Sequence, residues 1–471
     1  MKNKIILITI FIICAVSGLK AQNNPLLYDF KDIPQSLLLN PGTAFNAKWH
    51  AGVPFLSGVF VSGGLSNVSV YDIFGNDGRD INDKIQEVIY SQNRKDAGYL
   101  NEQIDIFNGG YASKNEKDYY SFGMYQETDI MGYWPKDIAI LVYEGNTIGT
   151  SFNLGDLNGK GELLTVYHFG ITRKISDQLT IGGRVKLYNS IFNIDATKIS
   201  GTFTTVEDNT NFYAHEIVAN MAIKTAGVTP WVDEEGEAFI DTQKMGDLIK
   251  ERFFLGGDLG LGADIGFTYD WNPQWTVTGS LIDIGFVSHT KDVENYTIDG
   301  AYTTSGLKFI PENKSDNSDA WQDLKDDIQE KIPYERNTNK YTTFRPVKLN
   351  ASVKYKFGDA SDGTCDCLAG SKNEERYSDA VGLQLFAVER PRGPQTALTA
   401  FYYKRLFSFL NAKATYTADK YSKTNFGLGI STHFANFNAY VLMGDVLKYT
   451  NIAKANTASL QFGINYIVPN R

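Results

Sequence analysis

The sequence predicts an all-β fold, a transmembrane antiparallel β-barrel of about fourteen strands, with roughly 12 to 18 as the range. Apolar and polar residues alternate along many segments, as they do in strands with one oily and one polar face. Mean hydropathy is −0.26 although the chain holds 27 tyrosines and 29 phenylalanines. That combination is typical of barrels with a polar lumen and an aromatic outer face. The chain also begins with an export signal.

Composition excludes several other classes of protein. No apolar run reaches the roughly 18 residues of a membrane-spanning helix, so the chain is not a helical membrane protein. Because 42% of the residues are apolar, the chain can bury a core and is not an acidic disordered protein. Three cysteines are too few for a disulfide-rich scaffold.

Residues 1–21 form the expected signal peptide. Lys2 and Lys4 are its basic start, residues 5–16 its apolar stretch, and Ala21 the small residue before the cut. Lipoprotein processing at Cys14 is disfavoured, because Ile13 stands where a small residue is needed. Removing residues 1–21 takes the formal net charge from −9 to −12, which argues against nucleic acid as a partner. We expect export to the outer membrane, with its lipid as the surroundings of the barrel.

The clearest strand runs from Leu259 to Tyr269, where every odd position is apolar or aromatic and every even one is small or polar. A turn at 270–273 follows, and residues 275–281 return in the opposite direction. The phase then slips at Ile282 and Asp283, which predicts a β-bulge.

The same alternation recurs along the rest of the chain. Strong runs cover 165–174, 179–191, 347–357, 426–431 and 460–466. Weaker runs lie near 50–71, 118–133, 137–153, 197–206, 212–224, 274–288, 379–390, 395–406, 410–417 and 437–445. A soluble sandwich would show the same alternation, but the length and number of the runs favour membrane-spanning strands of roughly nine to eleven residues.

Three intervals near 72–117, 225–252 and 289–344 break the alternation and predict loop insertions. The first carries a helix over 80–92, with Ile81, Ile85 and Val88 at helical spacing and Asp80 as its cap. The second holds an acidic cluster at 233–237 and a helical run over 242–250, and the third an amphipathic helix over 318–332. Because strands resume after each interval, residues 49–471 form one barrel.

Residues 28–42, which end in Asn40-Pro41-Gly42, resemble the N-terminal segment of a Bacteroidota outer-membrane barrel family of unassigned function. The segments 179–187 and 280–286 resemble strands of that family. More distantly, Asn40-Pro41-Gly42 is similar to the Asn-Pro-Ala of the long-chain fatty-acid transporter family and of barrels associated with type IX secretion, with Gly in place of Ala. The transporter resemblance implies a plug segment at 22–48 inside the barrel, but no ligand.

If the apolar faces of the strands contact lipid, the opposite faces point into the lumen. Ile181, Val185, Leu261, Ile265, Leu349 and Val353 are then the expected lipid-facing residues. The lumen-facing candidates are Arg184, Lys186, Asp258, Asp264, Lys348, Lys354 and Lys356. Charges in a wet lumen set selectivity, and the alternative is that they pair with one another and stiffen the barrel.

No enzyme, cofactor or metal signature is present, so we expect no catalytic activity. The five histidines are scattered, and His168 is the first candidate only if distant strands assemble a hydrolase. Cys365 and Cys367 lack a nearby histidine to complete a metal site. Asp77, Asp80 and Asp83 lack the order of a calcium loop and are expected to solvate a loop and cap a helix.

Two functions follow from these expectations. The first is a barrel that binds or passes a small solute, including a hydrophobic one. The second is a non-transporting accessory or structural barrel in type IX secretion or surface assembly, whose loop insertions dock a partner protein. The sequence does not distinguish the substrate, the oligomeric state or the redox state of the cysteine pair.

Overall fold

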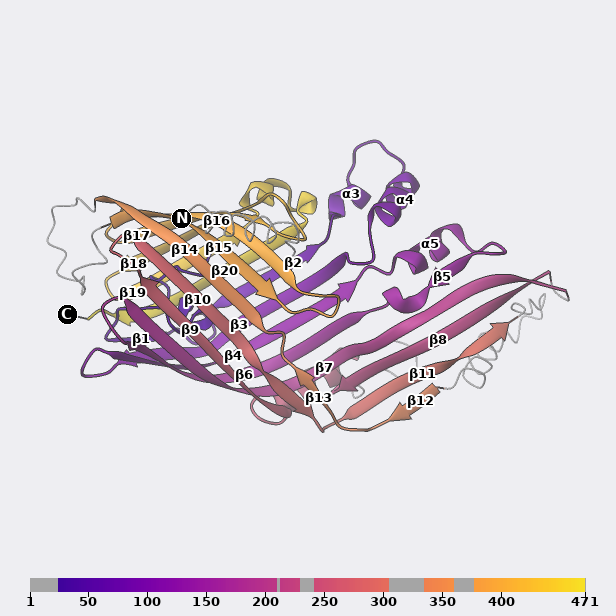
Figure 1. Cartoon of the computed structure of the whole chain (residues 1–471), viewed down its shortest axis with the longest axis horizontal. Helices are drawn as coiled ribbons and strands as arrows, with labels where there is room; N and C mark the ends of the chain where they lie inside the picture. The colour runs from indigo at the N-terminus through magenta and orange to yellow at the C-terminus, as the bar shows by residue number, and fades with distance from the viewer. Residues whose placement is uncertain (1–23, 210–211, 229–240, 305–333, 360–376, 471) are drawn as a thin grey trace, which may run out of the picture.

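The computed structural model describes residues 24–209, 212–228, 241–304, 334–359 and 377–470 (Figure 1). The expected signal peptide, the acidic cluster at 233–237, the helix at 318–332 and the cysteine pair at 365 and 367 lie outside these residues. Within the part of the chain that is described, no helix is long and apolar enough to cross a membrane.

The strands form one antiparallel sheet that closes on itself as a fourteen-stranded transmembrane barrel, as predicted. The ring runs β1 and β2, β3, β4, β6, β7, β9, β10, β13 and β14, β15, β16, β17, β18, β19 and β20. The first seven positions hold β1 (Trp49–Gly52), β2 (Val59–Leu65), β3 (Ala97–Ala112), β4 (Asp118–Tyr133), β6 (Gly159–Lys174), β7 (Leu179–Asp208), β9 (Asp258–Asp270) and β10 (Trp275–His289). The remaining seven hold β13 (Tyr341–Phe344), β14 (Lys348–Asp359), β15 (Tyr377–Val388), β16 (Gln395–Phe407), β17 (Leu410–Ala418), β18 (Asn425–Phe434), β19 (Phe437–Gly444) and β20 (Thr457–Val468). Closure comes from β20, which pairs with β1 at Trp49↔Val468 and with β2 at Val59↔Phe462.

The two ends of the barrel differ in the length of their connections. Turns at 113–117, 175–178, 271–274, 408–409 and 435–436 share one end, which we call the turn end. The other end, the loop end, carries α3 (Val70–Phe74), α4 (Ile81–Ser91), α5 (Lys136–Glu144), β5 (Ser151–Asn153), η1 (Leu154–Asp156), α6 (Thr242–Arg252) and η3 (Val446–Lys454). Outer-membrane barrels typically have short turns at one end and long loops at the other.

One part of the wall continues beyond the ring at the loop end (Figure 1). Strand β7 has 30 residues, about 100 Å of extended chain at the usual rise. Its first part pairs with β9, and its second part pairs with β8 (Phe212–Ala226). Strand β8 pairs with β11 (Val293–Thr304), which pairs with β12 (Tyr334–Asn337). These strands form a sheet that we call the wall extension.

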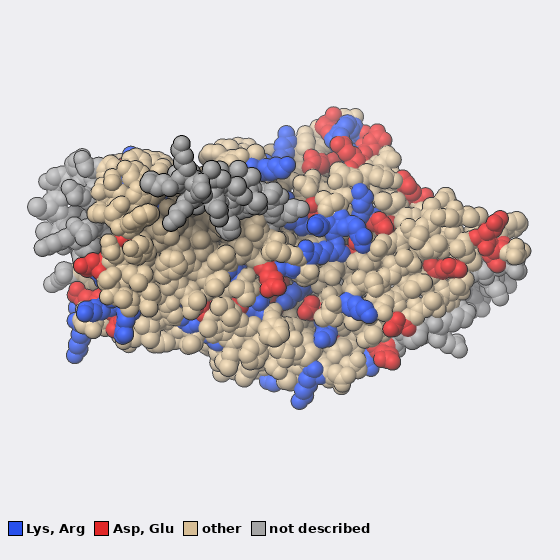
Figure 2. All heavy atoms as spheres, in the orientation of Figure 1, with Lys and Arg blue, Asp and Glu red and all other residues tan. Residues whose placement is uncertain are grey.

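The outer face of the ring is apolar. All six expected lipid-facing residues are exposed on it, from 37% at Leu349 and Val353 to 62% at Val185. Aromatic pairs girdle the turn end, with ring centres 5.3 Å apart for Trp49 and Tyr466 and 5.0 Å for Trp275 and Tyr355. Figure 2 shows few charged side chains between the turn end and the middle of the visible face, whereas charges gather toward the loop end. This pattern matches an apolar band bounded by aromatic residues.

Several local predictions are confirmed. The β9–β10 register shifts between Leu281 and Ile284, at the predicted bulge. Helix α4 begins after Asp80, whose carboxylate accepts from the Asn82 backbone N–H at 2.7 Å, and α6 covers the helical run predicted over 242–250. Asp77 pairs with Arg79 and Lys84 in the loop before α4.

Three expectations are wrong in part. The interval 72–117 contains β3 as well as helices, because consecutive polar residues at 101–103 and a register shift between Asp105 and Phe107 hide the alternation of that strand. The interval 289–344 contains β11 and β12, which belong to the wall extension, and β13, which pairs with β10 in the ring. Residues 136–144 form α5 rather than part of a strand at 137–153, because this segment crosses the loop end and only β5 pairs with β7.

Candidate functional site

The N-terminal segment, residues 24–48, lies inside the barrel and contacts several sectors of its wall. Its side chains Leu26, Leu27, Phe30 and Ile33 pack with Tyr440 and Leu442 of β19. Further along, Leu38 joins a cluster with residues of β4, β6, β7 and β10, and Leu37 and Ala47 pack beside Tyr119 and Ile467. Apolar side chains thus anchor the segment to opposite sides of the lumen.

The Asn40-Pro41-Gly42 motif occupies a seat made by two wall glycines. A Cβ at Gly182 of β7 would overlap the Pro41 carbonyl, and one at Gly266 of β9 would overlap the Asn40 amide. Hydrogen bonds hold the motif there: Thr172 Oγ1 donates to the Pro41 carbonyl at 2.6 Å, and Asn40 Nδ2 donates to the Phe267 carbonyl at 3.1 Å. Only glycines allow the segment to come this close to the wall.

Arg184 ties the short helix α2 (Ser36–Leu39), which comes directly before this motif, to the wall. Its guanidinium donates to the backbone carbonyls of Leu37 and Leu38, the latter at 3.1 Å, and pairs with Asp264 at 3.0 Å. The Arg184 side chain is 1% exposed, so these bonds replace the water around its guanidinium. Ser280 Oγ adds a bond to the Leu39 carbonyl at 2.6 Å.

From Asp264 a chain of ion pairs crosses the lumen, which we call the lumen network. Lys186 lies 3.0 Å from Asp264 and 2.6 Å from Asp283, and Lys348 lies 2.8 Å from Asp283 and 3.1 Å from Glu127. Arg345 continues it from Glu127 at 3.2 Å to Glu162. Because Lys348 belongs to β14 and Glu127 to β4, the network joins walls that are not neighbours in the ring.

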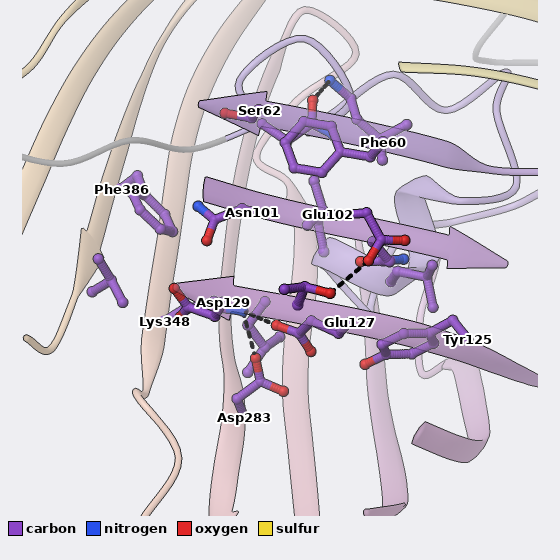
Figure 3. Close-up of a pocket in the computed structure, with 18 of the residues that line it drawn as sticks. Phe60, Ser62, Asn101, Glu102, Tyr125, Glu127, Asp129, Asp283, Lys348 and Phe386 are labelled. Carbon is purple, nitrogen blue, oxygen red and sulfur yellow. Dashed lines mark hydrogen bonds and ion pairs between the residues drawn. The ribbon is translucent and has the colours of Figure 1, made fainter. Parts of the chain in front are cut away.

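A cavity of about 110 Å³ lies beside the lumen network, and we call it the chamber (Figure 3). Leu27 and Leu38 of the N-terminal segment line it, as do Phe60, Tyr125 and Phe386 from the wall. Its charged lining includes Glu127, Asp129, Asp283, Lys186, Lys348 and Arg390. A dry cavity of about 150 Å³ holds benzene, so the chamber is too small for a larger solute until something moves.

Two connections at the loop end, 389–394 and 419–424, reach across to β3 and β4 and form what we call the roof. Arg392 stacks on Tyr133 with its Cζ 4.4 Å from the ring centre, and its backbone N–H donates to the Tyr133 hydroxyl at 3.0 Å. Arg392 Nη2 donates to the Gly155 carbonyl at 2.9 Å, and Arg390 pairs with Asp129 at 2.7 Å.

The second roof connection makes similar contacts. Tyr421 packs on Tyr99 with ring centres 4.5 Å apart, and Lys420 donates to the Lys95 carbonyl. The strands that these connections join lie on the opposite side of the ring from β3 and β4. The N-terminal segment lines the chamber through Leu27 and Leu38, and the roof lines it through Arg390.

The lumen-facing candidates lie at three places. Arg184, Lys186, Asp264 and Lys348 meet in the lumen network, where the first three are buried and the Lys348 side chain is 22% exposed. Asp258 lies apart, buried beside His289 and Arg252. Lys354 and Lys356 line a separate cavity at the turn end. His168 is buried with its ring 5.8 Å from that of Tyr125.

The sequence analysis did not identify the roof, and it identified only half of the residues in the lumen network. Glu127 and Asp129 occupy alternate positions of a run predicted as a strand, so the polar-face argument could have found them. Asp283 stands in the predicted bulge. Arg345 and Arg390 lie between strands, where no periodicity marks an inward side chain.

Comparison with known proteins finds a matching family and several similar solved structures. The model of DUF5723, a family of unknown function, matches residues 41–444. No curated protein matches the chain.

Three solved structures are similar to this chain over most of its length. The Ralstonia pickettii toluene transporter TbuX is 10% identical with a TM-score of 0.42, over 93% of this chain and 94% of that one. A Pseudomonas aeruginosa FadL homologue is 9% identical with a TM-score of 0.42, over 96% and 99%. The Pseudomonas putida toluene transporter TodX is 8% identical with a TM-score of 0.35, over 96% and 94%.

Proposed function

We propose that this chain, which belongs to the DUF5723 family of unknown function, is an outer-membrane barrel that takes a small solute into its lumen and releases it across the membrane. The observation that carries this proposal is the chamber, an internal space that is lined both by the N-terminal segment and by Arg390 of the roof. The turn end faces the periplasm in this proposal, because outer-membrane barrels carry their short turns there.

The N-terminal segment acts as a plug in this proposal, and the roof as a second closure. Polar contacts such as those of Thr172 and Arg184 hold the plug, and contacts of this kind can be exchanged for water when the segment moves. The chamber offers apolar side chains beside paired charges, which suits a small solute with an apolar body.

Solute uptake by proteoliposomes tests this proposal. Liposomes that contain the purified, folded protein are mixed with neutral solutes of increasing size, and swelling is followed by light scattering. We expect slow, size-limited swelling with the natural sequence and faster swelling once the N-terminal segment is displaced. Passage would be excluded if liposomes never swelled with the natural protein or with the displaced segment, and if the protein bound no solute.

The wall extension favours a second candidate, a non-transporting accessory or structural barrel in type IX secretion or surface assembly. Phe212 near its tip is 86% exposed, and Tyr213 and Val218 are exposed on the same strand. Exposed apolar residues on a projecting sheet are typical of an interaction surface. Cross-linking in cells followed by mass spectrometry distinguishes the candidates: a stoichiometric secretion or assembly partner supports this one, and no partner excludes it.

A further inference from the structure

A small cavity lies at the loop end beside Asp419, the first residue of the roof connection 419–424, and we call it the oxygen cavity. Thr417, Asn425 and Ser459, whose side chains carry oxygen atoms, also line it. Its volume is about 10 Å³, which is about the space that one water molecule or one ion needs. An organic solute does not fit, so the ligand of this cavity is a water molecule or a single ion.

Two buried carboxylates at this place have oxygen atoms without a hydrogen-bond donor. Asp419 is 6% exposed, and its Oδ1 accepts from the backbone N–H groups of Tyr421 and Ser422 at 2.8 and 2.7 Å. Its Oδ2 has no hydrogen-bond partner among the described residues. Asp445 follows the cavity residue Gly444, is 1% exposed, and accepts no hydrogen bond from a described residue on either carboxylate oxygen. Buried carboxylates are stable when a cation or hydrogen-bond donors compensate them.

The described cations compensate only part of this charge. Lys448 Nζ lies 3.5 Å from Asp445 Oδ2 and also donates to Asn456 Oδ1 at 3.3 Å. In the part of the chain that is described, no cation lies within ion-pair distance of the Asp419 carboxylate. Burial raises the pKa of the Asp419 carboxyl to about 7, and the charge of Asp445 acts in the same direction. A water molecule would supply donors but no charge, so a cation compensates the two carboxylates better.

The oxygen atoms around the cavity suit calcium. Asn425 Oδ1 accepts from the Asp445 backbone N–H at 2.9 Å and keeps a second lone pair. Calcium takes about six to eight oxygen ligands in a flexible arrangement of carboxylate, amide and water oxygens, whereas magnesium requires a near-ideal octahedron. Two carboxylates with neutral oxygens on several strand ends form an irregular set of this first kind.

We propose that the oxygen cavity binds one calcium ion, held by the carboxylates of Asp419 and Asp445 together with neutral oxygens such as that of Asn425. The ion joins the start of the roof connection to the start of η3, so it fastens the roof at the loop end. Without the ion the two ionised carboxylates repel each other, and protonation relieves the same repulsion. The pH dependence of the roof therefore belongs to the calcium-free protein. Calcium binding itself does not depend on solute passage.

Isothermal titration of the full-length mature protein with calcium chloride and with magnesium chloride tests this site. The protein is refolded into detergent, so that no lipopolysaccharide contributes bound calcium, and is then freed of divalent ions with EDTA. We expect one calcium ion per chain, bound at least tenfold more tightly than magnesium. No binding up to about 10 mM calcium, above the range of extracellular calcium sites, would leave water in the cavity and overturn the proposal. Equal affinities for the two ions would overturn the choice of calcium.

Variants of nearly unchanged shape locate the ion. Asp419→Asn and Asp445→Asn each remove one charged ligand, and each should weaken calcium binding at least tenfold. Asp83→Asn, at an exposed aspartate of α4 at the same end of the barrel, is the matched control and should bind calcium as the natural protein does. Unchanged affinity in both site variants, or an equally large loss in the control, would place the ion elsewhere and overturn the assignment.

Hydrogen exchange of residues 419–424 measures whether the ion fastens the roof. At neutral pH we expect exchange in the natural protein to be at least tenfold slower with calcium than with EDTA. Asp445→Asn should show a much smaller difference, because the ion loses one of its two charged ligands. A natural protein that binds calcium but exchanges equally fast in both buffers would overturn the role of the ion in the roof.

Discussion

Gly182 in the barrel wall and Pro41 in the N-terminal segment are in direct backbone contact, so close that no larger side chain fits at position 182. The neighbouring Gly183 is different, because its nearest contact for an added Cβ is the Asp264 carbonyl oxygen at 3.9 Å. Substitutions at these two adjacent residues of β7 therefore distinguish displacement of the N-terminal segment from disturbance of the barrel wall.

Gly182→Leu should displace the N-terminal segment, whereas Gly183→Leu should leave it in place. A leucine at 182 overlaps the Pro41 carbonyl, and one at 183 points to the outer face. Limited trypsin digestion followed by mass spectrometry checks this prediction through cleavage after Lys31. We expect cleavage at least tenfold faster in Gly182→Leu than in Gly183→Leu, and equal rates in the two variants would contradict the seat.

Outward substitutions to arginine should impair insertion into lipid. Ile265→Arg and Val353→Arg place a charge on the apolar face, which costs roughly 2–4 kcal/mol at the bilayer midplane. Ser352→Arg is not a neutral comparison, because Ser352 bonds Thr278 at 2.9 Å and contacts Asp29 inside the barrel. Val353→Leu is the better control, and refolding yield into vesicles is the measurement. Efficient folding of both arginine variants would mean that these strands do not face lipid.

The lumen network should contribute strongly to stability when only one partner is removed. Lys186→Met leaves Asp264 and Asp283 without a shared cation in a buried site, a change that typically costs about 3–5 kcal/mol. Lys174→Met, at an exposed pair with Asp177, should cost no more than about 1 kcal/mol. Guanidinium unfolding in lipid vesicles measures both, and similar losses would show that the network is not closed to water.

The roof should loosen as the pH rises toward neutral. Burial raises the pKa of the Asp419 carboxyl to about 7, and Asp445 nearby acts in the same direction. Because the protonated carboxyl is favoured in the folded state, its contribution to the stability of the roof is complete below about pH 4, the usual aspartate pKa. This contribution is lost as the pH rises through the folded pKa of about 7. Hydrogen exchange of residues 419–424 should therefore be faster at pH 8 than at pH 5.

Asp419→Asn provides the control for this dependence, since an asparagine cannot ionise. We expect the difference in exchange between pH 8 and pH 5, corrected for intrinsic chemistry, to shrink strongly in this variant. An unchanged difference would show that another group governs the roof.

Much of the architecture could be predicted from the sequence, because alternation along a strand directly reports which side chains meet lipid. The alternating positions of β9 and the bulge at Asp283 are examples. Contacts that depend on tertiary geometry could not be predicted in this way. The local sequence does not identify Gly182 as the residue that contacts Pro41, since glycines also occur in strands for other reasons. Arg392 lies in a connection whose sequence has no alternation of apolar and polar residues. Strand β3 was hidden because its polar residues are consecutive.

Arg392→Ala should weaken the roof, because it removes the stack on Tyr133 and the donor to the Gly155 carbonyl. A cation–π contact contributes about 0.5–2 kcal/mol, and the hydrogen bond adds to it. Cysteine labelling at an introduced Asn350→Cys, in the chamber wall of a protein that also carries Cys365→Ser and Cys367→Ser, measures access from the loop end. We expect at least fivefold faster labelling in Arg392→Ala than in Arg79→Ala, an exposed loop control. Equal rates would mean that the roof does not close the chamber.

Single-channel conductance in planar bilayers tests the central claim, a membrane barrel closed by its N-terminal segment and its roof, most directly. The natural protein, Gly182→Leu with Arg392→Ala, and Gly183→Leu with Arg79→Ala are compared after folding into lipid. We predict a mostly closed natural protein, sustained open events in the first double variant, and the natural behaviour in the second. Sustained conductance of the natural protein, or a first double variant as silent as its control, would contradict the account.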